Sequence, residues 1–133
     1  MMSLRFMTNL LLLCAGAFVV VCSQAFGAGV TGWITFGVAL GLLGMLGLAQ
    51  FGRGRGITQH GLDVLTGALA IWTVIASVVF GGATVIWLSF AEGIGFAALA
   101  AAGLMLHELS TERIVHTLEV EETSRRSHYA EAV

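Results

Sequence analysis

Hydrophobic residues in this chain gather into two long blocks, and polar residues lie before, between and after them. The blocks cover residues 6–50 and 64–106, and the main polar segments cover 50–63 and 107–133. A helix needs about 20 apolar residues to cross the hydrocarbon core of a membrane, and each block is about twice that long. The pattern therefore predicts two membrane spans in each block, joined as a helical hairpin.

Glycine marks the expected turn inside each hairpin. The first block contains Phe26-Gly27-Ala28-Gly29 and the second contains Phe80-Gly81-Gly82-Ala83, and glycine permits the dihedral angles of a tight reversal. We predict an all-α polytopic membrane protein, a single membrane domain over 1–133. The expected spans are 7–26, 30–50, 63–80 and 83–106. A loop at 51–62 would then join the two hairpins, which cover 7–50 and 63–106, and a partly helical tail would cover 107–133.

Composition agrees with a membrane protein. Of the 133 residues, 57% are hydrophobic and only 11% are charged, whereas soluble domains carry about 25% charged residues. The formal net charge is −2 and the sequence contains no basic patch, which argues against nucleic acid as a partner. The expected surroundings are lipids, and other integral membrane subunits or further copies of this chain.

The arginines predict the orientation. The basic residues outside the apolar blocks are Arg5, Arg53, Arg55, Arg113, Arg125 and Arg126. Short basic segments stay on the cytoplasmic side of a membrane, and two spans per block place both termini and the central loop on one side. We therefore expect cytoplasmic ends. Residues 1–28 have some features of a signal peptide, but they lack a clean cleavage site, so we expect a retained first span.

The two blocks align with each other without a gap when the sequence is shifted by 54 residues, with eight identities over 9–50 against 63–104. The rare residue types that match are Ser23 with Ser77, Phe26 with Phe80, Trp33 with Trp87 and Phe36 with Phe90. The alignment predicts a duplicated hairpin, with both copies inserted in the same direction about an axis along the membrane normal. The alternative is a chance similarity between two hairpins rich in glycine and aromatic residues.

This pattern resembles the SPW-repeat family of small bacterial membrane proteins. In that family a two-span unit carries Ser-Pro-Trp near the outer end of its first helix and a tryptophan shortly after the turn. Here Ser23-Gln24-Ala25 and Ser77-Val78-Val79 take that place, over about residues 9–104, without the motif proline and tryptophan. The resemblance implies a multi-pass protein of the bacterial inner (plasma) membrane, and it implies no reaction.

Small residues on the second and fourth spans predict where helices pack. The candidates at suitable spacing are Gly37, Gly41, Gly44, Gly93, Gly95, Ala97 and Ala101. Small side chains let helix backbones approach in lipid, where dispersion contacts hold them together. We expect these two spans to pack closely, either on each other or on a partner protein. Trp33 and Trp87 lie near the outer ends of the same spans, which favours an interfacial belt.

Glu92 is the one acid inside an apolar block. At the rise of an α-helix it lies about 12 Å beyond the second turn, and a carboxylate at that depth costs a few kcal/mol unless it is protonated, paired or hydrated. Three interpretations stay open. Glu92 is protonated and hydrogen-bonded to serine or backbone, or it faces a polar group of another subunit, or it relays protons or binds a cation.

No residue set predicts catalysis, a metal site or a cofactor beyond bound lipid. The histidines lie outside the spans, so a haem held between facing helices is not expected. His107, at the inner end of the fourth span, leaves a pigment or haem edge as a minor alternative. Cys14 and Cys22 are about 12 Å apart along one helix, which is too far for a disulfide.

The tail is polar, with a loose apolar stripe at Leu109, Ile114, Val115 and Leu118. Helical spacing predicts that residues 107–120 continue the fourth span as a helix. The tail is either a solvated helix end that frays after Glu122 or a docking segment for a cytoplasmic partner.

These features favour a non-catalytic structural or accessory subunit of a larger membrane complex, of respiratory or photosynthetic type. The alternative is a small oligomeric transporter or channel that uses Glu92 as its intramembrane acid. The hydroxyl side chains that would line a pore are scattered singly: Thr35, Thr66, Thr73, Ser77, Thr84 and Ser89. A membrane enzyme is least favoured, because the sequence offers no pairing of nucleophile and base.

Overall fold

Four α-helices make up the part of the chain that the structure, a computed structural model, describes: residues 4–51 and 57–132. They are α1 (Leu4–Ala25), α2 (Ala28–Gln50), α3 (Ile57–Val79) and α4 (Gly82–Glu131). All four are long and apolar enough to cross a membrane. The predicted all-α polytopic fold is confirmed, and the chain is a multi-pass membrane protein.

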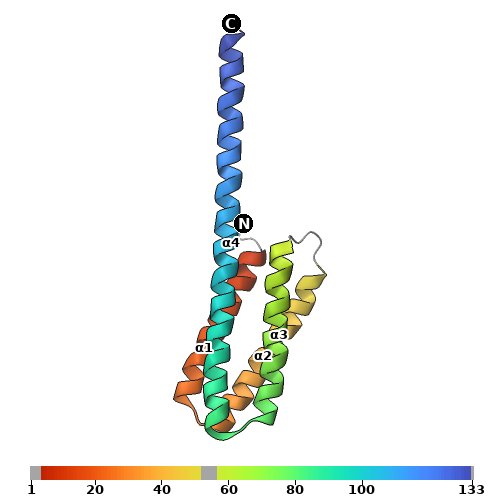
Figure 1. The fold of residues 1–133 in the computed structure, drawn as a ribbon, viewed down its shortest axis with the longest axis vertical. Coiled ribbons are helices and arrows are strands. Elements are labelled where there is room, and N and C mark those ends of the chain that lie inside the picture. Colours follow the sequence, from red (N-terminus) through yellow and green to blue (C-terminus); the bar gives the residue numbers. More distant parts are fainter. Residues whose placement is uncertain (1–3, 52–56, 133) are drawn as a thin grey trace.

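The helices form an up-and-down bundle from which α4 extends far beyond the other three (Figure 1). The start of α1, the end of α2, the start of α3 and the point where α4 leaves the bundle lie at one end, here called the arm end. The two tight turns lie at the opposite end, here called the turn end. Both hairpins therefore run in the same direction. Arg53 and Arg55, on which the predicted orientation partly depends, lie outside the described residues.

The first turn is one residue shorter than the sequence predicts, and the second has the predicted two residues, one position earlier. Only Phe26 and Gly27 separate α1 from α2. In the second hairpin α4 begins at Gly82, which adopts a φ of +60°. Residues with a Cβ are strained at a positive φ, so the reversal needs glycine at position 82.

Two other helix boundaries differ from the predicted ones. α3 begins at Ile57, so the second half of the predicted loop 51–62 is helical. Gln59 donates to Asp63 Oδ1 at 3.3 Å within this helix, which satisfies polar side chains that would otherwise favour a loop. α4 continues to Glu131, so the alternative in which the helix frays after Glu122 is wrong on that point.

Each hairpin packs mainly on the other hairpin. α1 makes its most extensive contacts with α4, and α2 makes its most extensive contacts with α3; the same pairs lie side by side in Figure 1. The apolar core draws on all four helices, with Leu12, Leu42, Ala70, Phe96 and Ala100 at its centre. The first helix of each hairpin thus lies against the second helix of the other.

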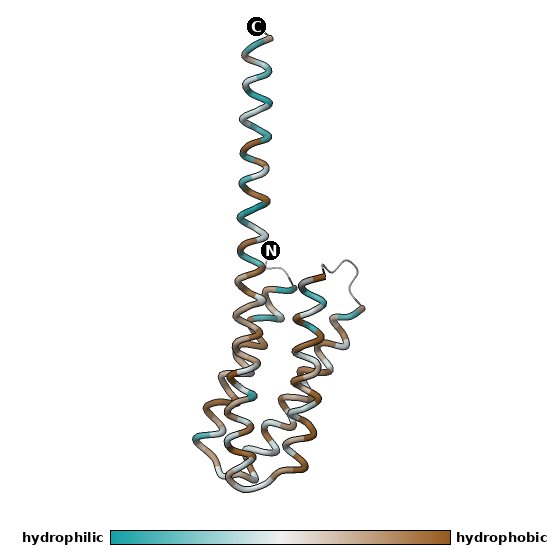
Figure 2. The backbone as a smooth tube through the Cα atoms, in the orientation of Figure 1, coloured by the Kyte–Doolittle hydropathy of each residue, from teal (hydrophilic) through white to brown (hydrophobic). Residues whose placement is uncertain are grey.

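Large apolar side chains point outward from the bundle. The exposed fraction reaches 76% for Trp33 and 66% for Trp87. Brown, apolar residues prevail over the bundle in Figure 2, whereas teal, polar residues are frequent along the extension of α4. Soluble proteins rarely expose apolar patches of this extent. A lipid environment removes the free-energy cost of exposing these side chains to water, because acyl chains are as apolar as they are.

Candidate functional site

Several polar side chains that the sequence scatters over four spans are buried inside the bundle. The buried ones are Asn9, Ser23, Thr31, Thr35, Thr66, Thr73, Ser89 and Glu92. The expectation of isolated hydroxyls is wrong for Thr35 and Ser89, which form a hydrogen bond with each other. Thr66 and Thr73 are buried as well. Of the other two predicted positions, Ser77 is half-buried and Thr84 is exposed.

Several of the buried hydroxyls bond to the backbone of their own helix. Thr66 donates to the carbonyl oxygen of Leu62, and Thr73 donates to that of Leu69, both at 2.8 Å. A polar donor in an apolar medium is costly unless it is hydrogen-bonded, and these bonds remove the cost without a second helix. Because a hydroxyl has a single hydrogen, each of these oxygens retains only the capacity to accept.

A hydrogen bond between side chains joins α2 and α4. Thr35 Oγ1 donates to Ser89 Oγ at 3.0 Å, and both residues are almost completely buried. The two residues are separated by 54 positions, which is the shift that aligns the two apolar blocks. In membrane proteins such bonds contribute about 0.6 kcal/mol on average to helix association. The pair therefore adds little to the strength of the α2–α4 contact, and its main effect is on the register of the two helices.

Glu92 lies one helical turn after Ser89 on α4, and its side chain is only 4% exposed. Its Oε1 atom has no hydrogen-bond partner among the described residues. Leaving a buried acceptor unpaired costs about 1–3 kcal/mol and more for a charged group. Since the chain itself covers this side chain, the interpretation in which Glu92 faces another subunit is wrong.

Glycines determine how closely α1 and α4 approach beside this site. A Cβ on Gly93 would lie 2.8 Å from the carbonyl oxygen of Gly16, and one on Gly16 would lie 2.7 Å from the carbonyl oxygen of Gly93. Gly103 lies against Asn9, whose amide atoms would be 2.7 to 2.9 Å from an added Cβ. Gly16 is not among the residues predicted from the sequence, although a lone glycine within an apolar span is a signal of close packing.

The predicted packing face is right for part of α4 and wrong for α2. A Cβ on Gly95 would lie 2.9 Å from Leu69, whereas one on Gly37, Gly41 or Gly44 would meet nothing within 4 Å. The reason is the helical repeat: these three glycines lie on the side of α2 opposite to its buried residues, which are Thr31, Gly32, Thr35, Ala39 and Leu42. The expected packing of α2 on α4 through Gly37, Gly41 and Gly44 is therefore wrong. Their packing on a partner protein stays a prediction.

The remaining small-residue candidates on α4 are Ala97 and Ala101. The backbone nitrogen of Ala97 takes part in the close contact with Gly16, because it would lie 2.7 Å from a Cβ added to that glycine. Ala101 is half-buried. Gly93 and Ala97 thus serve the contact of α4 with α1, whereas Gly95 faces Leu69 of α3.

The two tryptophans of the expected belt stand near the turn end in matching surroundings. Trp33 packs edge-on against Phe36, with ring centroids 5.8 Å apart and planes at 80°. Trp87 packs in the same way on Phe90, at 6.1 Å and 82°. Outward-facing rings at one end of the bundle fit an interfacial belt, which stays a prediction.

A groove of about 770 Å³ lies at the arm end, where α4 leaves the bundle. Its lining residues are Arg5, Gln59, Leu106, His107, Leu109, Ser110, Arg113, Ile114, Thr117 and Leu118. No acid is among them, and α1, α3 and α4 all contribute. The His107 ring lies 6.4 Å from that of Phe6.

Metal-binding and disulfide chemistry have no support in the described ranges. Within residues 4–51 and 57–132 no group of three or more His, Cys, Asp or Glu side chains is placed to hold a metal ion. Cys14 is exposed, Cys22 is buried, and both are free thiols.

No protein-family model, curated protein or solved structure matches this chain. The resemblance to the SPW-repeat family therefore stays a prediction. The function has to be argued from the bundle, its buried acid and the groove at the arm end.

Proposed function

We propose that this protein is a non-catalytic membrane anchor, an accessory subunit whose bundle holds a helical arm for a partner in a larger membrane complex. The arm is residues 107–131 of α4. The observation that carries the proposal is the continuity of α4, which runs unbroken from Gly82 to Glu131. At 1.5 Å per residue the arm projects about 37 Å beyond the bundle.

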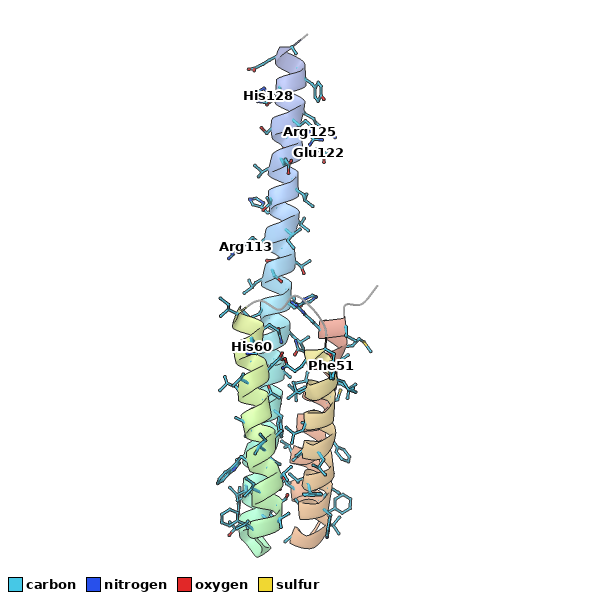
Figure 3. All side chains as sticks on the ribbon, turned by 90° about the vertical axis from the view of Figure 1, so that its right-hand side faces the viewer. Phe51, His60, Arg113, Glu122, Arg125 and His128 are labelled. Atoms are coloured by element: carbon cyan, nitrogen blue, oxygen red, sulfur yellow. The ribbon has the colours of Figure 1, made fainter. Side chains whose placement is uncertain are left out.

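The arm lacks the contacts that normally stabilise a helix. Its side chains radiate away from the axis (Figure 3), and Ile114, Val115 and Leu118 are each about 60% exposed. Most helices in proteins gain their stability from an apolar face packed on a neighbour. Ion pairs such as Glu122–Arg126, at 2.9 Å, contribute only about 0.3–0.5 kcal/mol each. A helix of this kind suits a partner that covers its apolar stripe.

The groove at the arm end indicates the chemistry of that partner. Arg113 supplies positive charge, and Leu109, Ile114 and Leu118 supply an apolar wall. A partner segment with an apolar face and a flanking acid complements both features. The exposed face of α2 around Gly41 offers a second contact, since small residues favour close approach of another membrane helix.

We further propose that the arm end of the bundle is cytoplasmic, in a bacterial inner membrane, and that the two hairpins are copies of one unit. Arg5 and Arg113 at the arm end support the orientation. Three observations support the duplication. The Thr35–Ser89 bond and the two Trp–Phe ring pairs relate residues by the 54-residue shift of the sequence alignment. In addition, the first helix of each hairpin packs on the second helix of the other.

Site-specific photocrosslinking from the arm in native membranes tests the anchor proposal. A crosslinker at Ile114 or Leu118 is expected to capture one partner in stoichiometric amounts, and Leu118→Asp is expected to abolish co-purification. Glu112 and His116, on the opposite side of the arm, are the matched control positions and should give little product. Equal crosslinking from both sides, or intact co-purification of Leu118→Asp, would contradict the proposal.

A small transporter or channel is the second candidate. The observation in its favour is the buried Oε1 atom of Glu92, which lacks a partner in the described chain. The tight contact of Gly16 with Gly93 leaves no room for a path between α1 and α4, which ranks this candidate second. Proton or cation flux into vesicles that contain the wild-type protein, if Glu92→Gln abolishes it, would make the transporter or channel the first candidate.

A further inference from the structure

A pocket of about 310 Å³ lies at the turn end, where α2 begins, α3 ends and α4 begins (Figure 1). We propose that this pocket is a binding site for an acyl chain of one phospholipid, whose headgroup lies in the leaflet at the turn end. The site is at the end of the bundle opposite to the arm and is independent of what the arm binds.

The walls of the pocket are apolar. Trp33, Phe36 and Phe80 line it, and none of the described residues in its lining is charged. Ser77 also lines the pocket, but its Oγ donates to the carbonyl oxygen of Val74 at 3.0 Å, so its hydroxyl hydrogen is already bonded. Apolar cavities stay dry and take up apolar molecules. The lining therefore suits a hydrocarbon chain and offers no opposite charge to an ionic ligand.

Glycine leaves this space open. Gly32 of α2 lines the pocket, and the 54-residue shift that aligns the two hairpins pairs it with Ile86. A Cβ on Gly32 would lie 3.6 Å from the carbonyl oxygen of Ser77 and 3.7 Å from Val85, which is ordinary contact. Gly29, also in the lining, has nothing within 4 Å of an added Cβ. The missing side chains at positions 29 and 32 thus make room for a ligand and do not serve close helix packing.

The pocket is continuous with the lipid-facing surface of the bundle. Two of its lining residues, Trp33 and Val78, are 76% and 71% exposed, so acyl chains of the membrane reach it directly. Its volume is at the lower end of the range of about 300–1,000 Å³ that is usual for small-molecule pockets, which suits one chain and not a whole lipid. Gly81 and Gly82 of the second turn also line it, and we expect the headgroup beside this turn.

Quenching of tryptophan fluorescence by a brominated lipid tests the site, because bromine on an acyl chain quenches an indole ring that it contacts. Trp33 is in the described lining and Trp87 is not, although both pack edge-on against a phenylalanine. The single-tryptophan proteins to compare are therefore Trp72→Phe with Trp87→Phe, and Trp72→Phe with Trp33→Phe.

The two proteins are titrated in detergent micelles with phosphatidylcholine that carries brominated chains. We expect the quenching of Trp33 to saturate at one lipid per protein, and the quenching of Trp87 to rise only in proportion to the total lipid. The same curve for both tryptophans, or a Trp33 curve that does not saturate, would overturn the proposal.

Variants that fill the pocket show whether the chain lies inside it. Gly32→Ile introduces the side chain of the paired position 86, and it is expected to remove the saturable quenching of Trp33. Gly29→Leu gives the same test if Gly32→Ile does not fold, since its side chain enters open space. Gly47→Leu is the matched control, because Gly47 is also an exposed glycine of α2 with nothing within 4 Å of an added Cβ. Saturation that survives in Gly29→Leu, or is lost equally in Gly47→Leu, would contradict the site.

Discussion

At the scale of single residues, the packing of this bundle depends on where glycines face. Gly16 and Gly93 lie at the contact between α1 and α4, and Gly41 lies on the outer surface of α2. The sequence identifies small residues as candidates, but it does not tell which side of a helix faces the bundle. Hydropathy gives no help here, because both the interior and the lipid-facing side of a span are apolar.

Gly93→Ala is expected to destabilise the bundle by about 1–3 kcal/mol, the usual cost of overpacking. The added methyl group would lie 2.8 Å from the Gly16 oxygen and from Val20, so one helix has to move. Unfolding in mixed micelles measures the change.

Gly41→Ala is the matched control for that substitution. Nothing lies within 4 Å of its added methyl group, and alanine is the better helix former by up to about 1 kcal/mol. We expect unchanged or slightly increased stability. Equal losses from both substitutions would show that the α1–α4 contact is not specific.

At the scale of helices, the sequence predicts the number and type of elements correctly and their ends less well. The four spans follow from block length, because backbone groups in lipid must be satisfied within a helix. The start of α3 at Ile57 and the end of α4 at Glu131 lie in polar segments, where hydropathy carries no signal. Which helices pair could not be predicted, since it depends on side-chain fit between segments far apart in sequence.

The Thr35–Ser89 hydrogen bond gives a prediction about helix pairing. Thr35→Val and Ser89→Ala each remove one partner of the 3.0 Å bond between α2 and α4. A double-mutant cycle is expected to give a coupling energy near the membrane-protein average of about 0.6 kcal/mol. Fully additive losses would mean that the two hydroxyls do not interact.

At the scale of the whole molecule, the chain consists of a packed bundle and a helix that leaves it. The candidate site was predictable only in part. Glu92 is conspicuous in the sequence as the acid in an apolar block, whereas its burial and the nearby Thr35–Ser89 bond depend on how the helices are placed. The arm was predicted as helical from its spacing, but its full length was not.

Removal of the outer part of the arm, residues 119–131, is expected to leave the bundle intact. Residues 119–131 are exposed throughout, so ending the chain after Leu118 should change the unfolding midpoint of the bundle very little. Thermal unfolding in detergent measures this. A large fall in the midpoint would mean that the arm stabilises the bundle, contrary to its proposed role in binding a partner.

The central claim is that two hairpins cross the membrane in the same direction, so that the arm end and the turn end lie on opposite sides. Labelling of single cysteines with a membrane-impermeant maleimide in intact cells tests it most directly, in a Cys14→Ala, Cys22→Ala background. Gly27→Cys and Gly81→Cys at the two turns are expected to react from outside, whereas His60→Cys and Ser124→Cys are expected to react only after the membrane is opened. Labelling of one turn but not the other, or of His60→Cys and Ser124→Cys from opposite sides, would contradict the account.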